Sequence, residues 1–413
     1  MPPVAAGVDF LQEPAAVFGV MLMLGALLAG IARRSFLSLT ALFVVAGFVL
    51  GQGGLEVLDL DPHSDFVQGL AVVALVLILF RDGLEVEAEM LQRAWHLPFR
   101  KLVLAMPLTA ALVALVTHTL TDLGWTESFL VGALLSPTDP VLSSIVITNP
   151  RVPRVIRHSL NLESGLNDGL ALPAVLAFTA AAESREDFVW WQFVIQDVGV
   201  GILTGLLVAF VAARVMPRGR TVLGGPSPHQ KALYALGVAF AAYGAAVLPP
   251  EGNGFIAVFV AAIAFGIWRP DIRECFETRS EDVLEVVTLG VLLVFGAIFT
   301  FDTLLVDGWA AVGIAAFTLL VARPVAVFVA LAGARQVDAA AKAFMAWFGP
   351  KGVATMTFAL FVLGSDVPEA GRVVGIAALT VFISILVHGL TDQPGAEWMA
   401  RRAERAQPAE SAA

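Results

Sequence analysis

The chain of 413 residues is 58% apolar and only 15% charged, and its mean hydropathy is +0.82. Soluble domains are about half apolar and a quarter charged, so this composition excludes an ordinary soluble enzyme and also a disordered chain. The formal charge of -10 leaves no basic surface for nucleic acid, and the single cysteine, Cys275, excludes an internal disulfide. The composition therefore predicts a polytopic membrane protein.

Apolar runs along the chain are candidates for membrane-spanning helices. About twenty apolar residues are enough to cross a ~30 Å hydrocarbon core as a helix. The runs are continuous rather than alternating, which excludes a transmembrane barrel. We expect an all-α fold with about 13 transmembrane helices. In chain order, the predicted spans cover 14–31, 36–50, 67–80, 102–120, 128–148, 159–182, 189–213, 231–249, 253–268, 283–300, 307–332, 343–363 and 371–390.

The basic residues orient the chain, because Lys and Arg concentrate on the cytoplasmic side of a membrane. With the N-terminus outside, 21 of the 25 basic residues fall in inner connections, 2 in outer connections and 2 within spans. The inner group includes Arg81, Lys101 and Arg269. The sequence thus predicts a multi-pass protein of the cell membrane, with an extracellular N-terminus and a cytoplasmic C-terminus. Residues 392–413 are expected to form a short cytoplasmic tail.

Five ionisable residues lie inside the predicted spans. An ionisable side chain at bilayer depth costs at least about 2.5–3.5 kcal/mol, so each one is a functional hypothesis. They are Asp139 in the fifth span, Glu163 and Asp168 in the sixth, Arg323 in the eleventh and Lys351 in the twelfth. If all five are charged, three negative and two positive groups leave a sum of -1. The six histidines fall in connections or near span ends, where we expect them to be solvated or to cap helices.

The fifth span contains Ser-Pro-Thr-Asp-Pro at 136–140. Each proline removes a backbone donor and disfavours helical geometry in the residue before it. The two prolines are therefore expected to unwind the span near the bilayer midplane, where free carbonyls are tolerated only around a wet or ion-filled cavity. The alternative is a simple proline kink, but a kink would not need Thr138 and Asp139 between the prolines.

The sixth span contains Glu-Ser-Gly-Leu-Asn-Asp-Gly at 163–169. Residues four apart share a helix face, so Ser164 lies beneath Asp168. Gly165 and Gly169 are also four apart, and this spacing lets another backbone approach closely; we expect the fifth span there. The site is rich in oxygen and lacks sulfur and imidazole, which favours a hard cation over a transition metal.

The twelfth span contains Gly-Pro-Lys-Gly at 349–352 and is a second interrupted helix. The two interrupted spans are the fifth of the first six and the fifth of the last six. Their offset of seven spans means that they cross the membrane in opposite directions. Interruptions at matching places in two inverted halves indicate the binding site of a secondary transporter.

These motifs resemble those of the monovalent cation:proton antiporters, in the branch of NhaP-type and NHE-type exchangers. The resemblance rests on S-P-T-D-P at 136–140, E-S-G-L-N-D at 163–168, A-R-P at 322–324 and G-P-K-G at 349–352. It implies two inverted six-helix repeats with the fifth and twelfth helices interrupted, and a homodimer within membrane lipid. The implied core transport part comprises 101–185 and 301–391, and the implied scaffold and dimerisation part comprises 1–100 and 186–300.

The resemblance also implies roles for individual residues. Asp168 resembles the carboxylate that binds cation and proton in turn, and Asn167 resembles its neighbour in the branch signature. Further cation contacts are implied for Ser164, for Asp139 and for the backbone carbonyl of Thr138.

Other residues have implied roles beside the cation site. Glu163 and Arg323 resemble a structural ion pair. Lys351 stands where arginine is commoner, and its expected role is to balance charge and helix dipoles. The stretch Phe-x-x-Gly-Leu-Glu at 80–85 resembles a segment near the ion path, which leaves open whether Asp82 or Glu85 lines that path or lies at a solvated helix end.

We therefore expect an antiporter rather than an enzyme, without a cofactor, exchanging Na+ for H+ one-to-one without net charge. Cation and proton would compete for Asp168 in an alternating-access cycle. One alternative is a K+/H+ antiporter of the same fold. Another is an intramembrane aspartyl protease using Asp139 and Asp168. That class carries Gly-x-Gly-Asp at one aspartate, which is absent here, and it has no role for Arg323 or Lys351.

Overall fold

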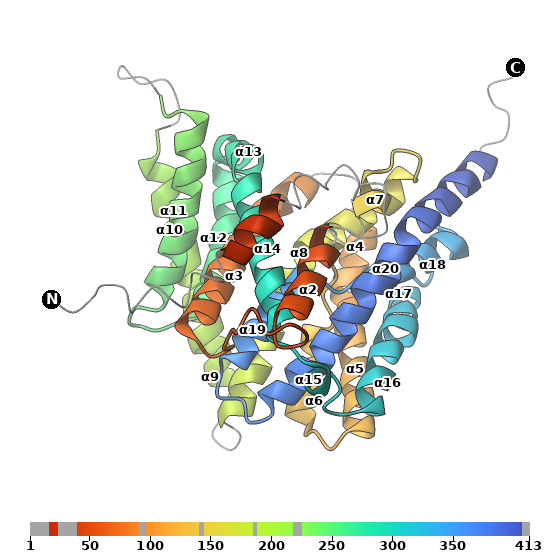
Figure 1. The fold of residues 1–413 in the computed structure, drawn as a ribbon. Coiled ribbons are helices and arrows are strands. Elements are labelled where there is room, and N and C mark those ends of the chain that lie inside the picture. Colours follow the sequence, from red (N-terminus) through yellow and green to blue (C-terminus); the bar gives the residue numbers. More distant parts are fainter. Residues whose placement is uncertain are drawn as a thin grey trace, which may run out of the picture.

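The computed structural model describes residues 16–23, 39–90, 96–139, 144–184, 188–217 and 225–406. Within these ranges the chain forms helices joined by turns and short irregular segments, and it contains no strand (Figure 1). The prediction of an all-α fold is therefore confirmed.

The first half of the chain supplies the helices around the fifth and sixth predicted spans. Residues 16–23 are helical. They are followed by α2 (Leu39–Leu50), α3 (Asp65–Met90), α4 (His96–Arg100), the π-helical segment η2 (Lys101–Ala105), α5 (Met106–Leu120), α6 (Trp125–Leu134), α7 (Ser144–Thr148), α8 (Arg154–Ser184), α9 (Trp190–Phe193), the π-helical segment η4 (Val194–Val200) and α10 (Gly201–Val215).

The second half supplies the helices around the twelfth predicted span. They are α11 (Pro228–Ala246), α12 (Gly254–Trp268), α13 (Pro270–Arg279), α14 (Glu281–Ala297), α15 (Phe301–Leu304), α16 (Trp309–Phe317), the π-helical segment η5 (Thr318–Ala322), α17 (Arg323–Ala330), α18 (Ala339–Trp347), α19 (Val353–Leu363) and α20 (Ala370–Ala406).

Six helical stretches in the described ranges are long and apolar enough to cross a membrane, or seven if the bent pair α12 and α13 forms one span. The helices α2 and α19 are apolar but shorter. These long apolar helices make the chain a multi-pass membrane protein.

Helix α3 continues past residue 80, where the third predicted span ends. The apolar run stops at Arg81 and Asp82, but the helix goes on to Met90 because α8, α12, α14 and α19 pack against it. Asp82 and Glu85 therefore lie inside a packed helix. Of the alternatives left open for this segment, the 1% exposure of Asp82 excludes a solvated helix end for that residue.

The bend between α12 and α13, which amounts to 117°, is another place where charge is buried. Arg269 lies at this bend with its side chain fully buried, although its position in an inner connection predicted exposure to solvent. Its guanidinium donates to the carbonyl of Met216 at 2.6 Å and to the carboxylate of Asp271 at 2.9 Å. These local partners make the burial of the charge tolerable.

Two predicted spans are interrupted. Helix α6 ends at Leu134, and the chain is not helical from Ser136 to Asp139; Pro140 lies outside the described residues. Helix α18 ends at Trp347, and α19 begins only at Val353. The fifth and twelfth predicted spans thus break where their prolines and polar residues stand.

The site is positioned by the packing of α8, which contacts α3, α6, α7 and α12. Figure 1 shows α10 to α13 gathered at one side of the molecule and α16 to α18 with α20 at the other. Helix α20 also packs against α19, so the last long helix supports the second broken span.

Candidate cation site

The two interrupted spans bind each other at their breaks. The backbone N–H of Asp139 donates to the carbonyl of Pro350 at 2.9 Å. The backbone N–H of Val353 donates to Oδ2 of Asp139 at 2.7 Å. Each break thereby satisfies polar groups that the other leaves open, which a broken helix needs at membrane depth.

The carboxylate of Asp139 lies at the first N–H of α19, the positive end of that helix dipole. This contact joins Asp139 to the other broken span. A Cβ on Gly352 would overlap the carboxylate of Asp139, so the contact requires glycine there.

Lys351 is fully buried between the two breaks. Its Nζ donates to the carbonyl oxygens of Pro137 at 2.9 Å and Ser136 at 3.3 Å, beyond the carbonyl end of α6. In the part of the chain that the structure describes, no carboxylate lies within ion-pair distance of this ammonium group. Its charge therefore faces carbonyl dipoles, which favour a cation.

Asn167 joins α8 to the first break, the non-helical residues 136–139 of the fifth predicted span. Its Nδ2 donates to the carbonyl of Thr138 at 2.7 Å and to the hydroxyl of Thr138 at 2.9 Å. The next residue, Asp168, is 7% exposed. Oδ1 of Asp168 and Oδ1 of Asn167 are buried and have no hydrogen-bond partner among the described residues. The side chain of Ser164, also predicted as a ligand, lies outside the described residues.

Glu163, about one and a half turns earlier on α8, is held by two cations. Nη1 of Arg323 lies 3.0 Å from its Oε1, and Nζ of Lys101 lies 2.6 Å from its Oε2. Lys101 also donates to the carbonyl of Ser159 at 3.0 Å. Both oxygens of this carboxylate are therefore paired.

Lys101 was missed as a site residue, because we counted it among the solvated residues of an inner connection. It is fully buried. The available signal was its position directly before the apolar run of the fourth span, where a lysine joins the helix rather than the loop.

Two acids of α3 also face α8. Asp82 is 1% exposed and lies on α3, which packs against α8. Oε2 of Glu85 lies 3.3 Å from the position that a Cβ on Gly165 would take. A Cβ on Gly169 would meet the ring of Phe259 on α12. The face on which we expected the fifth span is therefore covered by α3 and α12, a correction to the sequence-based expectation.

The charge balance of the site survives these additions. The five groups found from the sequence sum to -1. The two acids of α3, Asp82 and Glu85, add two negative charges, and Lys101 and Arg81, which pairs with Asp82 at 2.8 Å, add two positive charges. The extended set therefore also sums to -1.

His388 on α20 supports the second break. The hydroxyl of Ser384 accepts from the backbone N–H of Lys351 at 2.8 Å and lies 3.1 Å from Nδ1 of His388. Nε2 of His388 lies 2.9 Å from the carbonyl of Trp347, at the end of α18. This histidine is buried and contacts the last carbonyl of α18, so of the two expected alternatives it caps a helix rather than being solvated.

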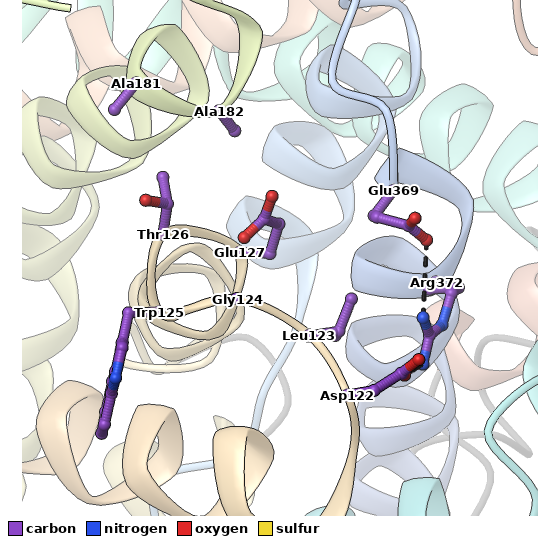
Figure 2. Close-up of a pocket in the computed structure, with 10 residues that line it drawn as sticks. All are labelled: Asp122, Leu123, Gly124, Trp125, Thr126, Glu127, Ala181, Ala182, Glu369 and Arg372. Atoms are coloured by element: carbon purple, nitrogen blue, oxygen red, sulfur yellow. Dashed lines mark hydrogen bonds and ion pairs between the residues drawn. The ribbon is translucent and has the colours of Figure 1, made fainter. Parts of the chain in front are cut away.

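A separate cavity of about 390 Å³ lies at the other end of α6 (Figure 2). It is lined by residues of the α5–α6 connection and of α8, and by Glu369 and Arg372 near the start of α20. Arg372 forms ion pairs with Asp122, Asp307 and Glu369. None of the predicted cation-site residues lines this cavity.

Comparison with known proteins defines the class of protein. Residues 20–398 match the model of the family described as "Sodium/hydrogen exchanger, transmembrane". This match covers most of the chain, so the chain belongs to the sodium/hydrogen exchanger family.

Individual relatives and a solved structure agree with this membership. The K(+)/H(+) antiporter NhaP of Alkalimonas amylolytica is 27% identical over 93% of this chain and 66% of its own length. The K(+)/H(+) antiporter NhaP2 of Shewanella sp. (strain ANA-3) is 24% identical over 88% of this chain and 63% of its own length. The Na(+)/H(+) antiporter NhaG of Bacillus atrophaeus is 24% identical over 91% of this chain and 73% of its own length.

The chain thus spans just under two thirds of the length of the NhaP and NhaP2 relatives. The sodium proton antiporter MjNhaP1 from Methanocaldococcus jannaschii has the same fold, with a TM-score of 0.78 at 19% identity, over 96% of this chain and 99% of that one.

Proposed function

We propose that this protein is a secondary transporter that exchanges a monovalent cation for H+, with Asp168 binding each of them in turn. The observation that carries this proposal is the buried Oδ1 of Asp168, which has no hydrogen-bond partner among the described residues. A buried carboxylate without a partner is costly, so it favours the uptake of a cation or a proton. The oxygen-rich surroundings suit a hard monovalent cation.

Other residues complete this site. The carbonyl of Thr138, the carboxylate of Asp139 and the hydroxyl of Ser164 would provide further oxygens for the cation. Asn167 would fix Thr138 through the two hydrogen bonds from its Nδ2. Lys351 would balance the carbonyl dipoles of the first break, which its Nζ contacts.

Glu163 and Arg323 would hold the core together as an ion pair, since their side chains lie 3.0 Å apart. Lys101 extends this pair to a triad. In this proposal the triad has no contact with the transported cation, because both oxygens of Glu163 are already paired.

The proposed exchange is one-to-one and carries no net charge. The charges around the site sum to -1, so one monovalent cation or one proton makes it neutral. The empty, charged core resists movement through the membrane because burial of an unpartnered charge is costly, whereas the neutral, loaded core moves. Cation and proton therefore cross in alternation.

The identity of the cation is the open choice within this proposal. We propose Na+, in line with the sequence-based expectation and with the name of the NhaG relative. The names of the NhaP and NhaP2 relatives favour K+ as the alternative. The protease alternative has no support, since the chain belongs to an exchanger family and Oδ2 of Asp139 is bound to the backbone of α19.

We also propose the finer architecture that the resemblance implied. Thirteen spans would form two inverted six-helix repeats, with the N-terminus outside the cell membrane and the C-terminus in the cytoplasm. A core part (101–185 and 301–391) would move against a scaffold part (1–100 and 186–300) that forms a homodimer in the lipid. The mutual contact of the two interrupted spans and the similarity to the MjNhaP1 fold support this arrangement.

Transport in proteoliposomes tests the proposed function. A pH-sensitive dye inside the vesicles reports proton movement after addition of Na+, K+ or Li+, with the membrane potential clamped at several values. We expect cation-driven proton movement at a rate that does not depend on the potential. A rate that rises steeply with voltage would contradict the one-to-one exchange, and the absence of any cation-driven signal would contradict antiport.

A further inference from the structure

Helix α20 runs along the second break, the non-helical residues 348–352 between α18 and α19, and contacts the chain near both of its ends. Near the first end, Nε2 of His388 lies 2.9 Å from the carbonyl of Trp347, and the indole Nε1 of Trp347 donates to the hydroxyl of Thr391 at 3.0 Å. Near the other end, the backbone N–H of Lys351 donates to the hydroxyl of Ser384 at 2.8 Å. One helix thus binds the chain on both sides of the two glycines and the proline between them.

The imidazole of His388 links these two contacts. The carbonyl of Trp347 can only accept a hydrogen bond, so Nε2 must carry a proton to bind it. On the other side of the ring, Nδ1 lies 3.1 Å from the hydroxyl and 2.8 Å from the carbonyl of Ser384. A continuous chain of hydrogen bonds therefore connects Trp347, His388, Ser384 and Lys351.

The two polar residues of α20 in this chain are buried in an otherwise apolar helix. Ser384 is fully buried and His388 is 3% exposed, and residues four apart share a helix face. Thr380, one turn earlier on the same face, is also fully buried, but its hydroxyl donates to the carbonyl of Ile376 within α20 itself. Ser384 and His388 differ from it because their hydrogen bonds reach the break.

Packing joins α20 to the same segment. A Cβ on Gly395 would overlap the ring of Phe348, so α20 carries glycine where the first residue of the break lies against it. The rings of Trp347 and His388 are also in contact, with centroids 5.4 Å apart. Displacement of α20 would therefore displace the break.

Lys351 connects this arrangement to the cation site. Its backbone N–H binds α20, whereas its Nζ donates to the carbonyls of Pro137 at 2.9 Å and Ser136 at 3.3 Å in the first break. The next carbonyl along the chain is that of Thr138, a proposed ligand of the cation. The position of this ligand oxygen thus depends on where α20 holds Lys351.

We propose that Ser384 and His388 are positioning residues of the cation site, which fix the second break on α20 and, through Lys351, the carbonyl oxygens of the first break. This inference rests on the proposed function and adds to it a determinant of cation affinity outside the ligand set. Ligands that are already held in place lose less conformational freedom on binding, so a fixed site binds more tightly. Groups that orient the ligands of a metal ion typically contribute 10–100-fold to its affinity.

The test compares Ser384→Ala with a matched control, Thr380→Val. Both substitutions remove one buried hydroxyl from the same face of α20, but only the hydroxyl of Ser384 binds the break. The apparent KM for Na+ and for K+ and the maximal rate are measured in proteoliposomes at one fixed pH, and the melting temperature is measured in detergent without these cations. We expect Ser384→Ala to raise the KM of the transported cation about tenfold and Thr380→Val to keep the wild-type KM.

The KM separates positioning from a purely structural role. Loss of structure alone would lower the melting temperature or the maximal rate and leave the KM of the folded protein unchanged, so an unchanged KM in Ser384→Ala overturns the inference. If Ser384→Ala folds but does not transport, the rise in melting temperature on addition of the transported cation reports binding. We expect this rise to shrink, and an undiminished rise overturns the inference.

A second pair of variants tests His388 by conservative replacement. His388→Gln keeps an N–H donor for Trp347 and an acceptor for the hydroxyl of Ser384, whereas His388→Leu keeps neither. We expect His388→Leu to raise the KM about tenfold and His388→Gln to recover most of the lost affinity. Equal KM values for the two variants would overturn the inference. This pair also decides the test if Ser384→Ala does not fold.

Two further outcomes complete the test. If neither Ser384→Ala nor His388→Leu folds, His388→Asn carries the same groups on a shorter side chain that cannot bridge Ser384 and Trp347, and an unchanged KM in this variant overturns the inference. If wild-type protein shows no cation-driven proton movement, the proposed function fails. If the wild type transports and the variants of Ser384 and His388 match its KM, only the positioning role fails.

Discussion

Glu163 and Asp168 are two buried carboxylates only five residues apart on α8, and their surroundings are opposite. Both oxygens of Glu163 are paired, one with Arg323 and one with Lys101. Oδ1 of Asp168 is buried and has no hydrogen-bond partner among the described residues. The comparison indicates that a buried carboxylate with both oxygens paired stabilises the fold, whereas a buried carboxylate with an unpartnered oxygen can bind an ion.

The largest effect on exchange is expected from substitution of Asp168, the carboxylate with the open oxygen. Asp168→Asn removes the charge that cation and proton share, so we expect exchange to fall to the background of empty vesicles. The protein should still fold, because the substitution keeps the shape of the side chain and removes a buried charge. Proton movement and melting temperature are measured on the same preparation. Cation-driven exchange near the wild-type rate would refute the role of Asp168.

The next largest effect, on stability, is expected from substitution of Glu163, whose two carboxylate oxygens are both paired. Glu163→Gln leaves Arg323 and Lys101 buried without a counter-charge, and removal of one partner from a buried ion pair costs about 3–5 kcal/mol. We expect a much lower folded yield and a lower melting temperature, measured by size-exclusion chromatography and thermal unfolding in detergent. A variant as stable as wild type would show that the triad does not hold the core.

A smaller loss of stability is expected from Arg323→Ala. It removes one of the two cations on Glu163, but Lys101 remains 2.6 Å from the carboxylate. The loss should therefore be clearly smaller than that of Glu163→Gln in the same unfolding measurement. The double variant Lys101→Met and Arg323→Ala leaves the carboxylate of Glu163 without a counter-charge, so we expect a severe loss of stability. Equal stability of the single and the double variant would show that Lys101 does not stabilise the carboxylate of Glu163.

The smallest effect is expected at Asp122, a paired carboxylate that lies at the surface. A hydrogen bond from Arg372 lowers the pKa of Asp122 below its usual range. Because its folded pKa is lowered, the pair contributes stability above the unfolded pKa and loses it as the pH falls through the folded pKa. Asp122→Asn should lower the melting temperature only slightly at neutral pH, since exposed ion pairs contribute little. The difference from wild type should vanish in acid, and a difference that grows there would contradict this account.

Much of the fold could be predicted because apolar runs mark helices in a membrane protein. Each predicted span contains helical residues in the described ranges, although only six helical stretches there, or seven with the bent pair, are long and apolar enough to cross a membrane. The two interruptions fall at Pro137 and at Pro350. The motifs also singled out Asp139, Asn167 and Lys351, which the structure brings together at the crossing of the two breaks.

The burial of Asp82 and Arg269 could not be recognised from the sequence, and that of Lys101 only from its position directly before an apolar run. Hydropathy scores each charged side chain as if it faced lipid, so a charge at the end of an apolar run is assigned to the connection. Lys101 and Arg269 are buried because partners far away in the sequence meet them, whereas Asp82 pairs with its neighbour Arg81 inside a helix that other helices cover. Lys101, for example, meets Glu163 across 62 residues of sequence. Such pairings depend on tertiary packing, which hydrophobic periodicity does not encode.

The hydrogen bond between Asp139 and Val353 also constrains how the protein is made. The two residues are 214 positions apart in the chain. At about 5–20 residues per second, a ribosome needs roughly 10–40 s to add that length. During this interval the first interrupted helix is already synthesised while the amide that its aspartate will bind does not yet exist. The fold is therefore completed late in synthesis. Until the second interrupted span is made, the polar groups of the first one must be bound by water, lipid headgroups or the insertion machinery.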